Sequence, residues 1–310
     1  MTRVFDLHAD LGMNIILKQE KNETRILENY HIQPMLQGEV YYCAAASFFD
    51  GSQNWKQMKE MITETRREIE SSDCGWIRKP KDLDPESDKV SFIMTVEGMC
   101  GIHSNPKEKI SWMYDQGVRI ASLVWNETND LATGTAGDPA RGLTDKGRKV
   151  IREMNRLHMI VDVSHANEHT FWDIYNTSER PVIATHSNCR TLCEQPRNMT
   201  DEMIIATAER GGLIGMNSYR RFISADRKHQ NALALAKHAK HIADIAGHQC
   251  LACGFDYLDY YRDMSKNKND LYRADQTQNF IKALREVGFT EDQVEDIGYR
   301  NVFRFLKDNM

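Results

Sequence analysis

Several histidines and carboxylates directly follow short apolar runs in this chain of 310 residues. Five of them share this position: His8, Asp10, Glu97, His165 and His186. Imidazole nitrogens and carboxylate oxygens are ligands with which proteins hold Zn²⁺. His8 and Asp10 are separated by one residue, so their side chains point to the same side of an extended backbone. The pattern predicts a metal centre, provided that the fold brings these runs together.

The five candidate ligands divide into two sets that share one carboxylate. His8, Asp10 and Glu97 would hold one cation. Glu97, His165 and His186 would hold a second, because the two oxygens of Glu97 can bridge two ions. Each cation would keep a position open for water, which is typical of catalytic sites and not of structural ones.

The elements that must position these residues alternate along the chain. Runs rich in β-branched and apolar residues predict eight strands, at 3–7, 40–48, 90–96, 118–124, 159–163, 182–185, 213–217 and 250–255. Amphipathic runs predict helices at 54–71, 106–116, 144–157, 168–177, 201–210, 230–246, 276–287 and 291–306. Such alternation favours parallel strands joined by helical crossovers.

Eight strand–helix units are the number in a closed α/β barrel, the (β/α)₈ or TIM barrel. We expect one such catalytic domain over residues 1–310. The alternative is an open, doubly wound sheet, which would carry a glycine-rich fingerprint after the first strand, and residues 7–12 have none. In a barrel the active site lies at the carboxyl ends of the strands. Trp125, Tyr219 and Asp256 also follow strands there.

Structural interpretations compete with the functional one. A single histidine after a strand is more often a hydrogen-bonded structural residue, and only the coincidence at several strand ends favours a site. His238 and His241 lie on a helix with Lys237 and Lys240, and we expect a solvated helix face there. The Cys250-x-x-Cys253 motif lies in an apolar run without a second pair, so we interpret it as packing and not as zinc ligation.

The charge balance excludes some classes of partner. With 40 basic and 45 acidic side chains the net charge is −5, which argues against binding to nucleic acid or to an anionic membrane. No apolar run approaches the ~20 residues that span a bilayer. The seven cysteines are expected to be reduced thiols in a cytoplasmic protein.

Five motifs, in this order, resemble those of the membrane dipeptidase (renal dipeptidase) family, peptidase family M19. They are Asp6-Leu7-His8-Ala9-Asp10, Val96-Glu97-Gly98, Asp162-Val163-Ser164-His165, Thr185-His186-Ser187 and Arg197-Asn198, and the resemblance covers essentially the whole chain. It implies a barrel of the metal-dependent amidohydrolase type that holds two Zn²⁺ ions. It also implies hydrolysis of dipeptides, including those with a C-terminal D-residue, by a metal-bridging hydroxide.

The resemblance assigns roles to further residues. Arg197 matches the residue that grips the free carboxylate of the substrate, and Tyr219 matches its companion there. Asp256 matches the aspartate at the reacting centre, where it would act as general base and then acid. We therefore expect Asp256 and Glu97 to be catalytic, and Trp125, Arg197, Tyr219 and Asp256 to contact substrate.

Two departures from the family pattern bear on substrate choice. Trp125 stands where mammalian members have a histidine near the scissile carbonyl. The family's Gly-Asp-Phe-Asp-Gly segment corresponds here to residues 255–259, and only its first aspartate, Asp256, is carried over. The resemblance also suggests a homodimer. An amidohydrolase acting on another amide or lactone stays open as an alternative, as does a metal-free barrel that only binds ligands.

Overall fold

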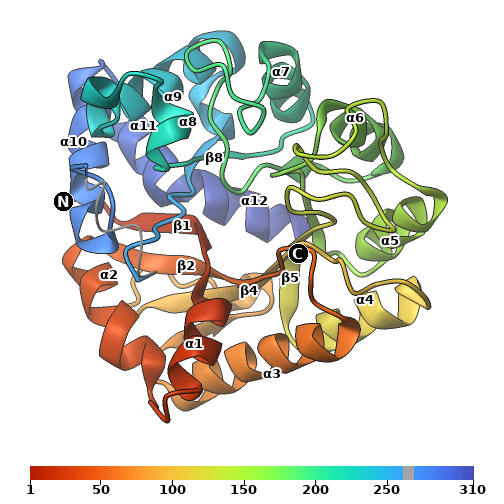
Figure 1. Cartoon of the computed structure of the whole chain (residues 1–310). Coiled ribbons are helices and arrows are strands. Elements are labelled where there is room, and N and C mark those ends of the chain that lie inside the picture. The colour runs from red at the N-terminus through yellow and green to blue at the C-terminus, as the bar shows by residue number, and fades with distance from the viewer. Residues whose placement is uncertain (261–268) are drawn as a thin grey trace.

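A parallel barrel forms the centre of the computed structural model, which describes residues 1–260 and 269–310 (Figure 1). Its strands, in chain order, are β1 (Val4–Ala9), β2 (Val40–Phe48), β4 (Ser91–Glu97), β5 (Val118–Ser122), β6 (Ile160–Asp162), β7 (Val182–Ile183), β8 (Ile214–Met216) and β9 (Leu251–Cys253). They pair in the order β7-β6-β5-β4-β2-β1-β9-β8. A parallel bridge between Ala184 and Ile214 joins the two ends, so the predicted eight-stranded barrel is confirmed.

The predicted helices are found between these strands and after the last of them. They are α3 (Trp55–Ser71), α4 (Pro106–Asp115), α5 (Asp145–Arg156), α6 (Glu168–Thr177), α7 (Asp201–Glu209), α9 (Ala232–Ala246) and α10 (Thr277–Glu286). The last predicted helix is divided into α11 (Glu291–Glu295), the π-helix η7 (Asp296–Arg300) and α12 (Asn301–Asn309). No helix in the described part of the chain is both long and apolar enough to cross a membrane.

Several short elements were not predicted. They are α1 (Leu11–Gln19), η1 (Leu27–Ile32), α2 (Gln33–Gln37), α8 (Arg220–Ile223), the strand β3 (Gly75–Ile77) and the 3₁₀ turns η2 (Pro80–Asp82), η3 (Arg227–His229), η4 (His248–Cys250) and η6 (Ala274–Gln276). Helix α1 has no side-chain hydrogen bond at its N-cap, so it lacks the usual signal for a helix start. Most of its residues are apolar, so it also lacks a clear polar face. The other elements are too short to show a period.

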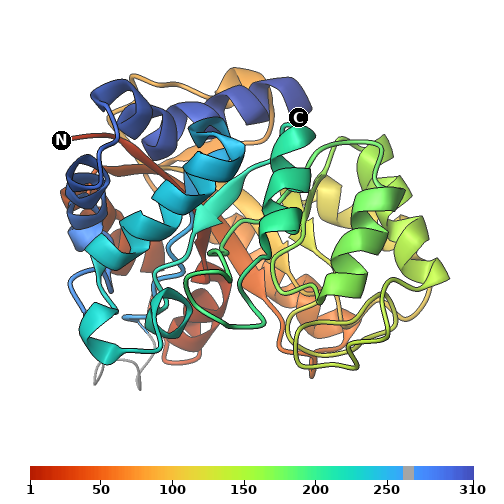
Figure 2. The same cartoon turned by 90° about the horizontal axis from the view of Figure 1, so that it is seen from above.

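Two apolar layers stabilise the barrel. The inner layer fills the barrel with side chains that include Phe5, Leu7 and Tyr42, and it continues onto Phe303 and Leu306 of α12. Helix α12 therefore covers the amino ends of the strands, on the side opposite the long loops that follow β5 and β7 (Figure 2). The outer layer lies between strands and helices. Because both faces of each strand are buried, the strands are continuous apolar runs.

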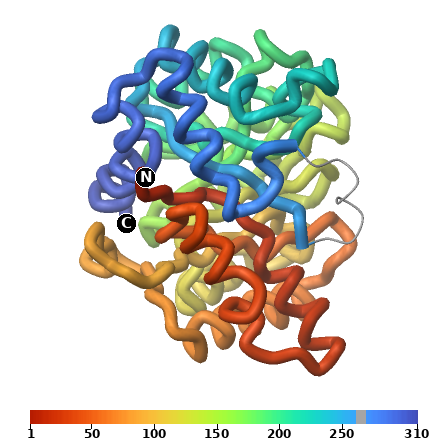
Figure 3. The backbone as a smooth tube through the Cα atoms, turned by 90° about the vertical axis from the view of Figure 1, so that its left-hand side faces the viewer, coloured from red at the N-terminus to blue at the C-terminus, as the bar shows by residue number. Residues whose placement is uncertain are grey.

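The two ends of the sequence pack together. Thr2 N donates to Gln278 Oε1 at 3.2 Å, and Gln278 Nε2 donates back to Thr2 O at 2.9 Å. Figure 3 shows the C-terminal helices beside the N-terminal strand. These contacts hold β1, which carries His8, in its place between β2 and β9.

Candidate active site

The carboxyl ends of four strands bring the five predicted ligands together. His8 lies in β1 and Asp10 follows that strand, and Glu97 is the last residue of β4. His165 and His186 follow β6 and β7. All five side chains are buried, although they are polar or charged. Groups of this kind are buried only where partners or a metal ion compensate for the lost water.

Glu97 lies at the centre of this cluster. Its Oε1 is 2.6 Å from His165 Nε2 and 3.3 Å from His186 Nε2. Its Oε2 is 3.3 Å from His8 Nε2, which is also 3.3 Å from Asp10 Oδ1. The two carboxylate oxygens thus face different histidines, which is the arrangement expected of a bridging ligand.

The donor atoms lie close enough together to hold a metal ion. The ligand atoms of His8, Glu97 and His186 lie within 4.8 Å of one another, as do those of His8, Asp10 and Asp256. The buried Nε2 of His8 makes no hydrogen bond, although two carboxylates lie 3.3 Å away. Nitrogens and oxygens that converge in this way without hydrogen-bond geometry suit a cation between them.

Hydrogen bonds to Nδ1 fix the rings of the second pair of histidines. His165 Nδ1 donates to Asn126 Oδ1 at 2.8 Å. Thr185 Oγ1 donates its only proton to Asp162 Oδ2 at 2.6 Å, so it accepts from His186 Nδ1 at 2.8 Å. In both rings Nε2 is left as the lone-pair nitrogen that faces Glu97, as in metal-ligating histidines generally.

The charges in the cluster shift the pKa values of its members. Burial would raise the pKa of Glu97, but the neighbouring His8 and His165 outweigh it and hold that pKa well below its usual range. Burial lowers the pKa of His165 to about 4 and that of His186 well below its ordinary value. An ionised carboxylate and two neutral imidazoles are the protonation states that bind metal ions. Burial would lower the pKa of His8, but Glu97 and Asp10 outweigh it and raise that pKa well above its usual value.

Asp256 is held beside this cluster in a left-handed backbone conformation, with φ at 57°. A non-glycine residue in this region is strained, and such strain is found mainly at functional sites. Its amide donates to His8 O at 3.2 Å, and Asn217 Nδ2 donates to its Oδ2 at 3.2 Å. Burial, together with the charges of Asp10 and Glu97, raises the pKa of Asp256 to about 8. The carboxyl group can therefore exchange a proton near neutral pH.

Asp6 connects the strands that carry His8 and Asp256. Its Oδ1 accepts from the backbone amides of His8 at 3.2 Å and Phe255 at 2.8 Å. Burial raises the pKa of Asp6 to about 6. The side chain therefore fixes the register between the ends of β1 and β9.

Arg197 lies next to the second pair of histidines, buried in the loop after β7. Its Nη2 is 3.3 Å from His186 O and its Nη1 is 3.5 Å from Ser187 Oγ, while its Nε has no hydrogen-bond partner. Burial lowers its pKa from the ordinary value of an arginine. A buried guanidinium with unused donors is suited to bind a carboxylate in a fork.

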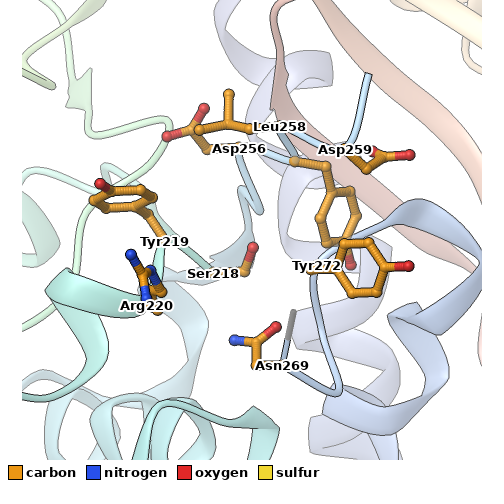
Figure 4. A pocket seen from close by; sticks show the side chains of 9 residues that line it. Ser218, Tyr219, Arg220, Asp256, Leu258, Asp259, Asn269 and Tyr272 are labelled. Carbon is orange, nitrogen blue, oxygen red and sulfur yellow. The ribbon is translucent and has the colours of Figure 1, made fainter. Parts of the chain in front are cut away.

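The two aromatic candidates lie at the edge of the site. The ring of Trp125 is 5.9 Å from that of His165 and 5.3 Å from that of Phe48, measured between centroids. Tyr219 lines a pocket together with Asp256, as Figure 4 shows. The structure thus brings every predicted site residue to one end of the barrel. The roles of these residues remain predictions.

Four residues with supporting contacts in the site were given no role by sequence reasoning: Asn126, Asp162, Thr185 and Asn217. Each lies at the end of a strand or within four residues after it, which is a signal that could have identified them. The expectation for His238 was wrong. It is buried, donates from Nε2 to Ile223 O at 2.8 Å and accepts through Nδ1 from Cys189 N at 3.3 Å.

Comparisons with known proteins agree with this geometry. A family model described as membrane dipeptidase (peptidase family M19) matches residues 1–309. An uncharacterized dipeptidase of Schizosaccharomyces pombe is 30% identical over 315 residues, which span 95% of this chain and 75% of that protein. An uncharacterized protein from the pqqA 5′ region of Klebsiella pneumoniae is 32% identical over 231 residues, or 71% of this chain and 83% of that one.

Solved structures share the fold at low sequence identity. A metallopeptidase from Rhodobacter sphaeroides, liganded with a phosphinate mimic of the dipeptide L-Ala-D-Ala, superposes with a TM-score of 0.84 at 20% identity. The superposition covers 100% of this chain and 99% of that one. An amidohydrolase from Pseudomonas aeruginosa gives a TM-score of 0.81 at 20% identity, covering 99% and 96% of the two chains.

Proposed function

Because the chain belongs to the membrane dipeptidase family, peptidase family M19, and is thus a peptide-bond hydrolase, we propose that it is a dipeptidase with two zinc ions. The observation that carries the proposal is the position of Glu97, whose two oxygens face His8 on one side and His165 and His186 on the other. His8, Asp10 and Glu97 would hold one ion, and Glu97, His165 and His186 the other. When bound, the ions supply a water nucleophile of lowered pKa and polarise the peptide carbonyl.

Asp256 is the residue that we propose to move the proton. Its carboxyl group lies close to the ligand atoms of His8 and Asp10. It would accept a proton from the attacking water and pass it to the nitrogen of the leaving amine. Asn217, which donates to Asp256 Oδ2, would keep the carboxyl group oriented during this transfer.

Arg197 would select short peptides. Arg197 lies beside the proposed ligand His186. A terminal carboxylate that Arg197 holds in a fork of two hydrogen bonds would therefore lie one residue from the bond that is cut. The dipeptide mimic bound by the Rhodobacter sphaeroides metallopeptidase supports a substrate of this length, since the two folds superpose over the whole chain. Trp125 would form the wall of the site beside His165.

The test is hydrolysis of a panel of L,L and L,D dipeptides by the metal-free protein and by the protein loaded with zinc. We expect zinc-dependent cleavage, a zinc content of two per chain, and no cleavage of N-acyl or C-amidated analogues. Cleavage that does not need a metal ion would contradict the proposal. Binding of two zinc ions without dipeptide cleavage would indicate that the substrate is another amide or a lactone.

Asp256→Asn tests the proton transfer separately from metal binding. We expect this variant to retain zinc and to lose turnover by about 10²–10⁴-fold, the usual contribution of general acid–base catalysis. The matched control is Asp244→Asn, which changes an exposed aspartate on α9 and should leave turnover unchanged. Wild-type turnover in Asp256→Asn would remove Asp256 from the mechanism.

A further inference from the structure

A pocket adjoins the site beside Tyr219 and Asp256. Its walls include Ser218, Arg220, Asp259 and Tyr272, and it is partly open to solvent (Figure 4). Tyr219 and Asp256 belong both to this pocket and to the proposed catalytic machinery. A dipeptide bound at the site would therefore have one of its side chains at the entrance of this pocket.

Among the described residues that line the pocket, Arg220 is the basic one. It is the first residue of α8 and is half-buried, and its Nε is buried without a hydrogen-bond partner. Within the described ranges 1–260 and 269–310, no ion pair of Arg220 is found. A buried donor that lacks an acceptor costs free energy, and an incoming acceptor removes that cost. The guanidinium thus offers a bidentate site for an anionic group.

The two aspartates that line the pocket do not pair with Arg220. Figure 4 shows the carboxylate of Asp259 across the pocket from Arg220 and directed away from it. The charge of Asp259 interacts with Arg273, which pairs with Asp275 at 2.9 Å. Asp256 is the proposed proton carrier and accepts from Asn217. Neither aspartate therefore neutralises Arg220 by direct contact.

The proposed mechanism decides which substrate residue meets the pocket. Asp256 would hand its proton to the leaving amine, and this amine belongs to the C-terminal residue of the dipeptide. Arg197 would hold the carboxylate of the same residue. A side chain that extends from this residue along Tyr219 would enter the pocket where Arg220 lies.

We propose that this pocket is a specificity subsite for an acidic C-terminal residue, whose side-chain carboxylate Arg220 binds. The protein would accordingly prefer dipeptides ending in Asp or Glu over those ending in Ala or Lys. This inference rests on the proposed function, because it assumes the orientation of the substrate that Arg197 and Asp256 impose.

The experiment compares kcat/KM for Ala-Ala, Ala-Asp, Ala-Glu, Ala-Lys and Asp-Ala, each with an L- and a D-residue at the C-terminus, on the zinc-loaded protein. For the wild type we expect Ala-Asp or Ala-Glu to exceed Ala-Ala by about 10- to 100-fold, the range of a hydrogen-bonded charged pair. Arg220→Gln should abolish this ratio, mainly through a higher KM for the acidic dipeptides. Arg220→Lys should restore part of it, since lysine keeps the charge but not the fork.

Arg221→Gln is the matched control, because Arg221 is the exposed neighbour on the same helix and does not line the pocket. It should retain the wild-type ratio. A wild-type enzyme that cleaves Ala-Ala as well as Ala-Asp, or that prefers Ala-Lys or Asp-Ala, overturns the subsite. An Arg220→Gln variant with an unchanged ratio overturns the role of Arg220. Absence of cleavage of every dipeptide instead contradicts the proposed function, so the two failures are distinguishable.

Discussion

At the residue scale, the site depends on polar side chains that orient other polar side chains. Glu97 lies among three histidines, and two of these rings are fixed through Nδ1 by Asn126 and Thr185. Asn126 Oδ1 in turn accepts from Thr135 Oγ1 at 2.8 Å. A ring oriented in this way keeps its Nε2 lone pair directed at the metal position. The supporting residues should therefore affect metal affinity, although they contact no ion themselves.

Thr185→Val tests whether Thr185 orients the ring of His186, because valine has the same shape but cannot accept a hydrogen bond from His186 Nδ1. We expect zinc to bind about 10- to 100-fold more weakly, as is usual for the loss of such a contact. The measurement is competition for zinc with a coloured chelator, which needs no turnover. Thr207→Val is the control, since Thr207 is an equally buried threonine whose hydroxyl donates to Met203 O on α7. Equal zinc affinity in both variants would contradict a role for Thr185 in positioning His186.

At the element scale, the segment after β1 is held together by a buried histidine. His31 in η1 contacts Asn14 in α1 through Nε2 and Oδ1 at 2.9 Å. Burial, and to a lesser degree the charge of Lys18, lowers the pKa of His31 to about 4. In the unfolded chain this pKa is about 6.5. Between these values the unfolded state binds a proton that the folded state does not bind.

His31 should therefore stabilise the fold fully above pH 6.5 and progressively less as the pH falls towards 4. The loss amounts to at most about 3 kcal/mol. His31→Gln retains a hydrogen-bond donor but does not titrate, so its stability should fall less over this window. Urea unfolding of metal-free wild type and variant at several pH values gives the comparison. Parallel curves for the two proteins would show that folding does not lower the pKa of His31.

At the scale of the whole molecule, closure of the barrel depends on close backbone contacts between β7, β8 and β9. A Cβ atom added at Gly215 would lie 2.0 Å from Thr185 O, and one added at Gly254 would lie 1.8 Å from the same oxygen. The obstructing atom belongs to the backbone, so it cannot turn aside as a side chain would. Thr185 directly precedes His186, so a shift of its backbone would also move a proposed ligand.

Gly254→Ala should destabilise the protein by about 1–3 kcal/mol or more, since the extra methyl group overpacks a rigid region. The melting temperature and the zinc affinity should both decrease. Gly288→Ala serves as the comparison: this glycine has a positive φ of 97° but no atom within 4 Å of an added Cβ, so only the backbone cost of about 1–2 kcal/mol applies. A Gly254→Ala variant as stable as Gly288→Ala and with normal zinc affinity would contradict this account of closure.

We also propose that residues 1–310 form one domain. Thr2, just before β1, contacts Gln278 of helix α10 near the other end of the chain, so the two ends of the chain belong to one core. Limited proteolysis of the zinc-loaded protein should therefore yield no stable fragment that corresponds to half a barrel. Recovery of a folded half with its own cooperative melting transition would require division of the chain into two domains.

The amino-acid sequence determined much of this protein through local signals. Buried parallel strands are apolar on both faces, so the eight runs identified the barrel, and β2 and α6 were predicted with the bounds that the structure has. The order of the motifs indicated the family and the residues at the strand ends. Short elements without caps, such as α1 and α8, carried no comparable signal and were not predicted.

Only the tertiary structure decided how these residues act on one another. The placement of Glu97 among His8, His165 and His186 depends on the closure of strands that are far apart in the sequence. The burial of His238 and the unpaired Nε of Arg220 likewise depend on neighbours from other elements. The physical reason is that periodicity reports which face of an element is buried, whereas distances, desolvation and pKa shifts arise from contacts between elements.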